Sequence, residues 1–127
     1  MGYGLDEKGM KMSKSKGNAI DPLPVIEKSG ADTFRFWSAS EINQGYDFRC
    51  SEQKIESTRK FLSKLWNVSR FLSSFPVIKS GQLSESDKWI LSELDKLISV
   101  CKEGYLKYNF FIPSTAIREF TLSLIHI

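Results

Sequence analysis

The sequence has few of the residues from which metal centres, disulfide frameworks and membrane anchors are built. Its 127 residues include only two cysteines and one histidine. Cys50 and Cys101 are far apart and lack the close spacing of metal ligands, and His126 has no partner histidine. We therefore expect no protein-bound metal and no histidine-based catalytic triad. Apolar runs are too short for a membrane-spanning helix, so no membrane partner is expected. No basic start precedes an apolar stretch, which predicts that a secretory signal is absent. The two widely spaced cysteines predict a reduced, cytoplasmic setting.

Composition and charge set the next limits. The chain is 41% hydrophobic, enough for a packed core, and carries a formal net charge of +3. Its length fits one small domain or parts of two, and it excludes a doubly wound nucleotide-binding sheet with an accessory domain. The bases are concentrated in residues 1–20 and 51–75. On charge alone, a solvated helix face is favoured over a nucleic-acid surface.

Strand signals are nearly absent, so the predicted fold class is mainly α. Residues 1–20 read as a loop with a short strand or turn at 3–5. Asp21 and Pro22 predict the start of a short helix, which Gly30 would end in the left-handed conformation. Asp32 is predicted to cap a second helix over 33–40, followed by a turn at 44–47 and an extended segment at 47–49.

Three longer helices are expected in the remainder. Ser51 would cap a helix reaching Phe75, a second would run from about residue 84 to Asn109, and a third would begin at Pro113. Apolar residues at alternating spacings of three and four predict a buried stripe on each of the first two. These stripes are Phe61, Leu65, Val68, Leu72 and Phe75, then Ile90, Leu94, Leu97, Cys101 and Tyr105. Core packing is likewise predicted for Trp66 and Trp89.

Four lysines mark the first loop as a candidate polyphosphate site. Serines and glycines separate them, and no carboxylate lies between Lys8 and Gly17. Lysine supplies a point charge on a flexible stem, hydroxyl and backbone N–H groups donate hydrogen bonds, and glycine lets a loop close over a ligand. Composition alone would still favour an exposed loop without a ligand. The lysines are Lys8, Lys11, Lys14 and Lys16.

The order of the residues favours a polyphosphate site over an exposed loop without a ligand. Residues 11–15 read KMSKS, followed by Lys16-Gly17-Asn18. This resembles the second signature of the class I aminoacyl-tRNA synthetases. The flanking residues 19–22 and 25–32 resemble the subgroup that acts on valine, isoleucine, leucine and methionine. Residues 34–49, 60–71 and 114–120 are most similar to the valyl-tRNA synthetases of archaeal-like type. An isoleucyl or leucyl enzyme, or a non-catalytic helical tRNA-binding module, remains an alternative.

The resemblance implies specific roles in the signature. Lys14 would stabilise the departing pyrophosphate and Lys11 would assist as a second cation. Ser13 and Ser15 would donate to ATP, and Met12 would anchor the loop against the core. The implied substrates are ATP with Mg²⁺, valine and tRNA(Val).

The resemblance also implies a division of the chain. Residues 1–50 would be the end of a catalytic domain with its stem-contact region, 51–83 a connecting helix and linker, and 84–127 the start of a truncated anticodon-binding helical domain. No His-Ile-Gly-His ATP motif is found, so a fragment of a monomeric enzyme, inactive by itself, is expected. Five bases are the expected tRNA phosphate contacts: Lys54, Arg59, Lys60, Lys64 and Arg70.

Overall fold

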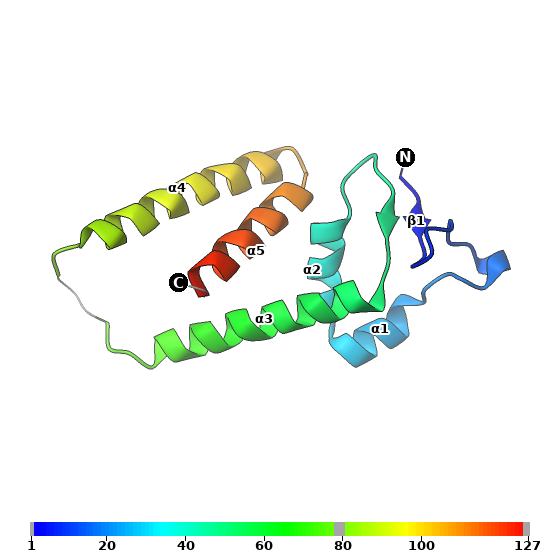
Figure 1. Ribbon diagram of the computed structural model, residues 1–127, viewed down its shortest axis with the longest axis horizontal. Coiled ribbons are helices and arrows are strands. Elements are labelled where there is room, and N and C mark those ends of the chain that lie inside the picture. Colours follow the sequence, from blue (N-terminus) through cyan, green and yellow to red (C-terminus); the bar gives the residue numbers. More distant parts are fainter. Residues whose placement is uncertain (1, 78–80, 126–127) are drawn as a thin grey trace.

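The computed structural model describes residues 2–77 and 81–125 and is mainly α-helical, which confirms the predicted fold class. A short two-stranded sheet with α1 and α2 lies near the N-terminus, α3 extends away from it, and α4 and α5 form a helical hairpin (Figure 1). No helix in the described ranges is both long and apolar enough to cross a membrane. The elements are β1 (Gly4–Leu5), the 3₁₀ turn η1 (Lys14–Lys16), α1 (Pro22–Ser29), α2 (Ala31–Glu41), β2 (Phe48–Arg49), α3 (Glu52–Ser73), α4 (Glu85–Leu106) and α5 (Phe111–Ile125).

The two predicted extended segments pair with each other. β1 and β2 are parallel, with Gly4 opposite Phe48 and Leu5 opposite Arg49. The chain returns to β1 after α1 and α2, so the pairing connects the first loop to the start of α3. A small core of Trp37, Cys50 and Ile55 lies beside the sheet, each 3% exposed.

Side-chain caps fix three helix starts at the predicted residues. Asp21 accepts a hydrogen bond from the backbone N–H of Leu23, and Ser51 accepts one from that of Lys54. Ser84 forms a reciprocal capping box with Asp87. These acceptors satisfy backbone N–H groups that a helix cannot pair internally.

Two predictions at the α1–α2 junction are wrong. Gly30 has φ 87° and ψ 148°, so its φ is positive but it is not in the left-handed helical region. Gly30 is the C-cap of α1 and also the N-cap of α2, which begins at Ala31. Because no residue separates the two helices except Gly30, Asp32 lies inside the first turn of α2 and does not cap it.

The predicted stripe on α3 is buried over only half its length. Phe61 is 3% exposed, whereas Leu72 is 63% and Phe75 is 56% exposed. The helix ends at Ser73, and the backbone N–H of Phe75 bonds back to the carbonyl of Leu72 in a tighter turn. The contacts of α1 and α2 with α3 fall on its N-terminal part, so periodicity identified the apolar face but not how far a partner covers it.

The stripe on α4 is also less buried than predicted. Ile90, Leu97 and Cys101 are half-buried, while Leu94 and Tyr105 are exposed. The fully buried position is Gly104, which faces Pro113 of α5.

The start of α5 differs from the prediction. The helix begins at Phe111, two residues before Pro113, and α4 ends at Leu106. The Asn109 side chain accepts hydrogen bonds from the backbone N–H groups of Phe111 and Ile112, so it serves the start of α5. Proline lacks an N–H, but the first turn of a helix tolerates it.

Replacing Gly104 with alanine should destabilise the chain although alanine is the better helix former. An added Cβ would lie 2.5 Å from Cγ and 2.7 Å from Cδ of Pro113. We expect a loss of about 1–3 kcal/mol in the free energy of unfolding from this overpacking, reduced by about 1 kcal/mol of helix propensity. Ser92→Ala, at an exposed position of α4, is the control and should not destabilise. Urea unfolding followed by circular dichroism measures both, and equal stability of the two variants would contradict the close contact.

Candidate functional site

The KMSKS residues follow a hairpin built on the edge of β1. The backbone N–H of Met12 donates to the carbonyl of Gly4 at 2.9 Å, and that of Asp6 donates to the carbonyl of Met10 at 2.8 Å. Leu5 and Lys11 form an antiparallel bridge. The reversal passes through Gly9, whose φ of 81° favours glycine. The start of the signature is thus held to the sheet by backbone hydrogen bonds.

Met12 attaches the signature to the core. Its side chain packs against the cluster of Trp37, Cys50 and Ile55 together with Phe48. This confirms the predicted anchoring of Met12 against the core. Burial raises the pKa of the Cys50 thiol, and the nearby charge of Glu7 raises it further, so Cys50 is a packed neutral thiol.

A single 3₁₀ turn shapes the middle of the signature. The Ser13 hydroxyl accepts from the backbone N–H of Lys16 at 3.3 Å and lies 3.0 Å from the Ser15 hydroxyl. Gly17 is left-handed, with φ 66°, and its N–H donates to the carbonyl of Lys14 at 3.1 Å. Both predicted hydroxyl donors are therefore engaged with the turn.

The ammonium groups of the loop are available to an anion. Lys11, Lys14 and Lys16 are exposed, and none of the ion pairs within residues 2–77 and 81–125 involves them. The Lys11 ammonium lies 3.8 Å from the centroid of the Tyr3 ring, a cation–π contact. The loop therefore presents unneutralised positive charge on a backbone fixed at its base.

Asp6 is a feature of this site that the sequence analysis missed. Its carboxylate accepts from the Asn18 side-chain amide at 2.9 Å and from the backbone N–H groups of Met10 at 2.8 Å and Lys8 at 3.0 Å. The Asn18 bond foremost, then the Met10 N–H, holds the pKa of Asp6 below its ordinary value, with Lys8 adding to the effect. The sequence signal that could have identified Asp6 is an acidic residue shortly before a basic loop that contains no acidic residue.

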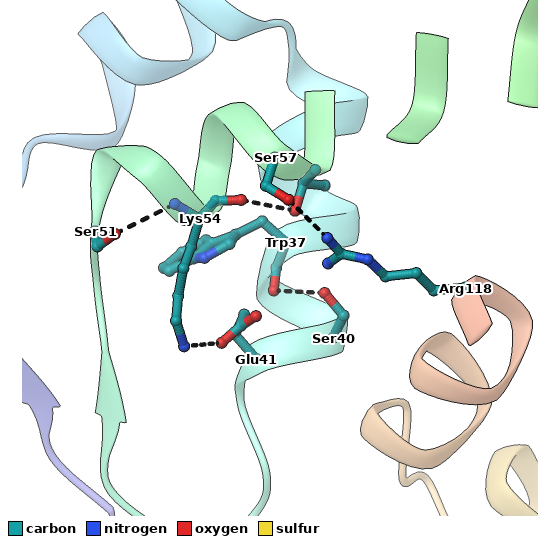
Figure 2. Close-up of polar contacts among 8 residues, drawn as sticks. Trp37, Ser40, Glu41, Ser51, Lys54, Ser57 and Arg118 are labelled. Carbon is teal, nitrogen blue, oxygen red and sulfur yellow. Dashed lines mark hydrogen bonds and ion pairs between the residues drawn. The ribbon is translucent and has the colours of Figure 1, made fainter. Parts of the chain in front are cut away.

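The five predicted tRNA contacts separate into two groups on α3. Lys54 pairs with Glu41 of α2, and Figure 2 shows its side chain extended toward that carboxylate. Arg59 binds Glu56 through two hydrogen bonds of 2.8 and 2.6 Å, which lower the pKa of Glu56. The other three are exposed and belong to no ion pair between described residues: Lys60, Lys64 and Arg70.

Helix geometry places only two of the five side chains on one face. At 3.6 residues per turn, Lys60 and Lys64 point about 40° apart, while Lys54 points about 120° away from Lys60. Arg70 points about 120° away from Lys64 and therefore lies on another face. Lys54 accordingly extends toward Glu41 of α2 (Figure 2). The structure thus brings Lys60 and Lys64 together and leaves Lys54 in a contact between helices.

An open groove also runs along α3. It has a volume of about 920 Å³ and runs between the α1–α2 junction and α3, with Lys28, Asp32, Arg59, Trp66 and Asn67 among its lining residues. Trp66 is 66% exposed and Trp89 is 54% exposed, so their predicted core packing is wrong. Phe61 packs in the core as expected.

The described ranges contain no group of three or more histidine, cysteine, aspartate or glutamate side chains placed to hold a metal ion. Polar chemistry in the loop therefore rests on lysine, serine and backbone groups.

Comparison with known proteins gives consistent matches. Residues 1–51 match the family of tRNA synthetases class I (I, L, M and V). The chain is 43% identical over 121 residues to the valine–tRNA ligase of Aeropyrum pernix, covering 93% of this chain and 15% of that protein. It is 46% identical over 112 residues to the valine–tRNA ligase of Bacillus cereus, covering 83% of this chain and 13% of that protein. The chain therefore spans about one seventh of the length of these curated relatives.

A solved structure shares the fold. It is the LeuRS of Agrobacterium radiobacter K84, in a ternary complex with tRNA and LeuAMS, and it matches with a TM-score of 0.76. The two are 24% identical, and the match covers 98% of this chain and 17% of that one.

Proposed function

By sequence, the chain is a segment of the valyl-tRNA synthetase family within class I, and on this premise we propose that it supplies the ATP-contacting loop and part of the tRNA-binding surface of a valine–tRNA ligase. In the proposed reaction a valine carboxylate oxygen attacks the α-phosphorus of ATP. Valyl-adenylate forms and pyrophosphate leaves. Mg²⁺ enters with ATP as part of the substrate.

The loop cations carry this proposal. Negative charge builds up on the leaving pyrophosphate, and preorganised cations stabilise it more in the transition state than in the ground state. Lys11 and Lys14 are exposed on a backbone tied to β1, free of carboxylate partners within the part of the chain that is described. Lys14 is proposed as the principal contact and Lys11 as the second. Ser13 and Ser15 would turn from each other toward phosphate oxygens when ATP binds.

The basic face of α3 supports binding of tRNA(Val). We assign sequence-independent phosphate contacts to Lys60 and Lys64 on one face and to Arg70 on another, because all three are exposed and none forms an ion pair between described residues. Lys54 and Arg59 would contribute only by exchanging Glu41 and Glu56 for phosphate. The exposed Trp66 in the adjoining groove offers a surface on which a base or ribose can stack.

The division of the chain follows the same proposal. Residues 1–50 would close the catalytic domain, 51–83 would connect, and 84–127 would begin the anticodon-binding domain. Cys50 and Cys101 are both free thiols, which fits a reducing cytoplasmic setting.

Neutralising Lys60 and Lys64 should weaken tRNA binding and reduce its dependence on salt. Each phosphate contact contributes roughly 0.7 to 0.9 to the slope of log K against log salt, so the double variant Lys60→Gln, Lys64→Gln should lower the slope by about 1.5. The matched control removes two charges from α4, Lys88→Gln with Lys96→Gln, whose lysines already pair with Glu85 and Glu93. Filter binding of tRNA(Val) across a salt series to the complete enzyme measures both. An unchanged slope in the α3 variant would remove this face from the tRNA interface.

The most direct test of the whole function is ATP–pyrophosphate exchange with a panel of amino acids on the complete polypeptide that contains this segment. Valine should give the highest kcat/KM. Exchange that depends equally on isoleucine or leucine would contradict the valine assignment.

A further inference from the structure

We propose that Asp6 and Asn18 form a clasp that positions the KMSKS loop, so that both act as positioning residues for Lys11 and Lys14. The inference rests on the proposed function but assigns a role to two side chains outside the pentapeptide.

The clasp joins both ends of the loop to the hairpin. The Asn18 amide oxygen accepts from the backbone N–H of Ser13 at 2.9 Å, inside the signature. The Asn18 amide nitrogen donates to Oδ2 of Asp6 at 2.9 Å and to the carbonyl of Lys11 at 3.3 Å. The Asn18 side chain therefore binds both Lys11 and Ser13, the first and third residues of the signature.

Asp6 completes the connection to the sheet. Its Oδ1 accepts from the backbone N–H groups of Lys8 and Met10, and its backbone N–H donates to the carbonyl of Met10. Asp6 directly follows β1, which pairs with β2. Residues 13–18 are thereby connected, through Asn18 and Asp6, to the paired strands β1 and β2.

The clasp also determines which groups the Asp6 carboxylate contacts. A free carboxylate this close in sequence to Lys8, Lys11 and Lys14 would attract their ammonium groups. Both of its oxygens are instead occupied by Asn18 and two backbone N–H groups. Three of its roughly four acceptor positions are thus filled, and no ion pair between described residues joins Asp6 to a lysine.

Donor and acceptor roles suggest a side-chain swap as the test. Asn18→Asp removes the donor and places two carboxylates together, and Asp6→Asn sets two amide groups against each other. In the double variant Asp6→Asn, Asn18→Asp, the amide of residue 6 can donate to the carboxylate of residue 18. That carboxylate can still accept from Ser13, but its other oxygen faces the Lys11 carbonyl oxygen, so that bond is lost and a repulsive contact replaces it.

The measurements are kcat and KM in ATP–pyrophosphate exchange on the complete enzyme, normalised by active-site titration. Each single variant should lose roughly 10- to 100-fold in kcat, because misplacement of charged groups by about 1 Å has effects of that size. The KM for ATP should rise and the KM for valine should not. The swap should be more active than either single variant, because the bond between residues 6 and 18 is restored, but less active than the starting enzyme, because the bond to the Lys11 carbonyl is not. Gln82→Glu, at an exposed position before α4, is the control for added charge and should be unaffected.

Three outcomes overturn the clasp: single variants with unchanged kinetics, a swap no better than Asn18→Asp, or a KM for valine that rises as much as the KM for ATP, as a general distortion of the active site would give. The variant Lys14→Ala, measured in parallel, separates the two proposals. If it is severely impaired while the single clasp variants are not, the clasp fails and the loop function stands. If Lys14→Ala is fully active, the proposed function itself fails.

Discussion

Lys14→Ala should slow valine-dependent ATP–pyrophosphate exchange by about 10²- to 10³-fold in the complete enzyme, the range typical of losing one preorganised stabilising group. The effect should fall on kcat, because the ammonium is proposed to meet charge that develops on the leaving pyrophosphate. Binding of tRNA(Val) should not change, since the basic face of α3 is separate from the loop. Filter binding checks this second expectation.

Lys16→Ala is the matched control for Lys14→Ala. Lys16 belongs to the same 3₁₀ turn, is exposed as Lys14 is, and carries the same charge, but lies outside the pentapeptide. General loss of positive potential would reduce both variants alike, whereas a specific phosphate contact reduces Lys14→Ala far more. Equal losses in the two variants, or equal losses in exchange and in tRNA affinity, would contradict the role assigned to Lys14.

Phe61→Ala should lower the free energy of unfolding by about 3–5 kcal/mol, the usual range for removing a buried aromatic side chain. Phe61 is 3% exposed, and its ring centroid lies 5.4 Å from that of Phe36 in α2. The Arg118 guanidinium of α5 lies 5.8 Å from the same ring, and Arg118 also donates to the Ser57 hydroxyl at 2.8 Å. Figure 2 shows Arg118 reaching from its helix toward Ser57. Phe61 thus lies where α2, α3 and α5 meet, and its loss would leave a cavity at that junction.

Trp66→Ala provides the contrast on the same helix. Trp66 is larger than Phe61 but 66% exposed, and substitutions at such surface positions usually change stability by no more than about 0.5 kcal/mol. Urea unfolding of the two variants followed by circular dichroism gives the comparison. If Trp66→Ala lowered the free energy of unfolding as much as Phe61→Ala does, Trp66 would be packed and the exposed groove would be closed.

The local structure was largely predictable because local chemistry determines it. Asp21 and Ser51 cap the helices they were expected to cap, and Ser84 caps the helix expected to start near it, since a short acceptor side chain before a helix meets unpaired N–H groups next to it in sequence. The KMSKS order likewise identified the loop and the family without knowledge of distant contacts. Gly30 shows the limit of local reasoning, because one residue there both ends α1 and begins α2.

Properties that depend on distant partners were not predictable. The periodicity of α3 marked Phe61 and Leu72 as equivalent, yet only Phe61 is covered, by α2 and α5. Charge counting grouped Lys54 with Lys60, yet only the fold brings Glu41 to Lys54. The Asp6–Asn18 bond spans twelve residues and depends on the hairpin that returns the chain to β1.

The sequence by itself determined the helical class, the N-caps of α1 and α3 and the position of the KMSKS loop, because each depends on residues within a few positions of one another. The tertiary structure alone decided which apolar residues are buried, which cations stay unpaired and how the loop is held. Burial and charge pairing depend on what approaches from elsewhere in the chain, and a side chain's own neighbours in sequence do not specify that approach.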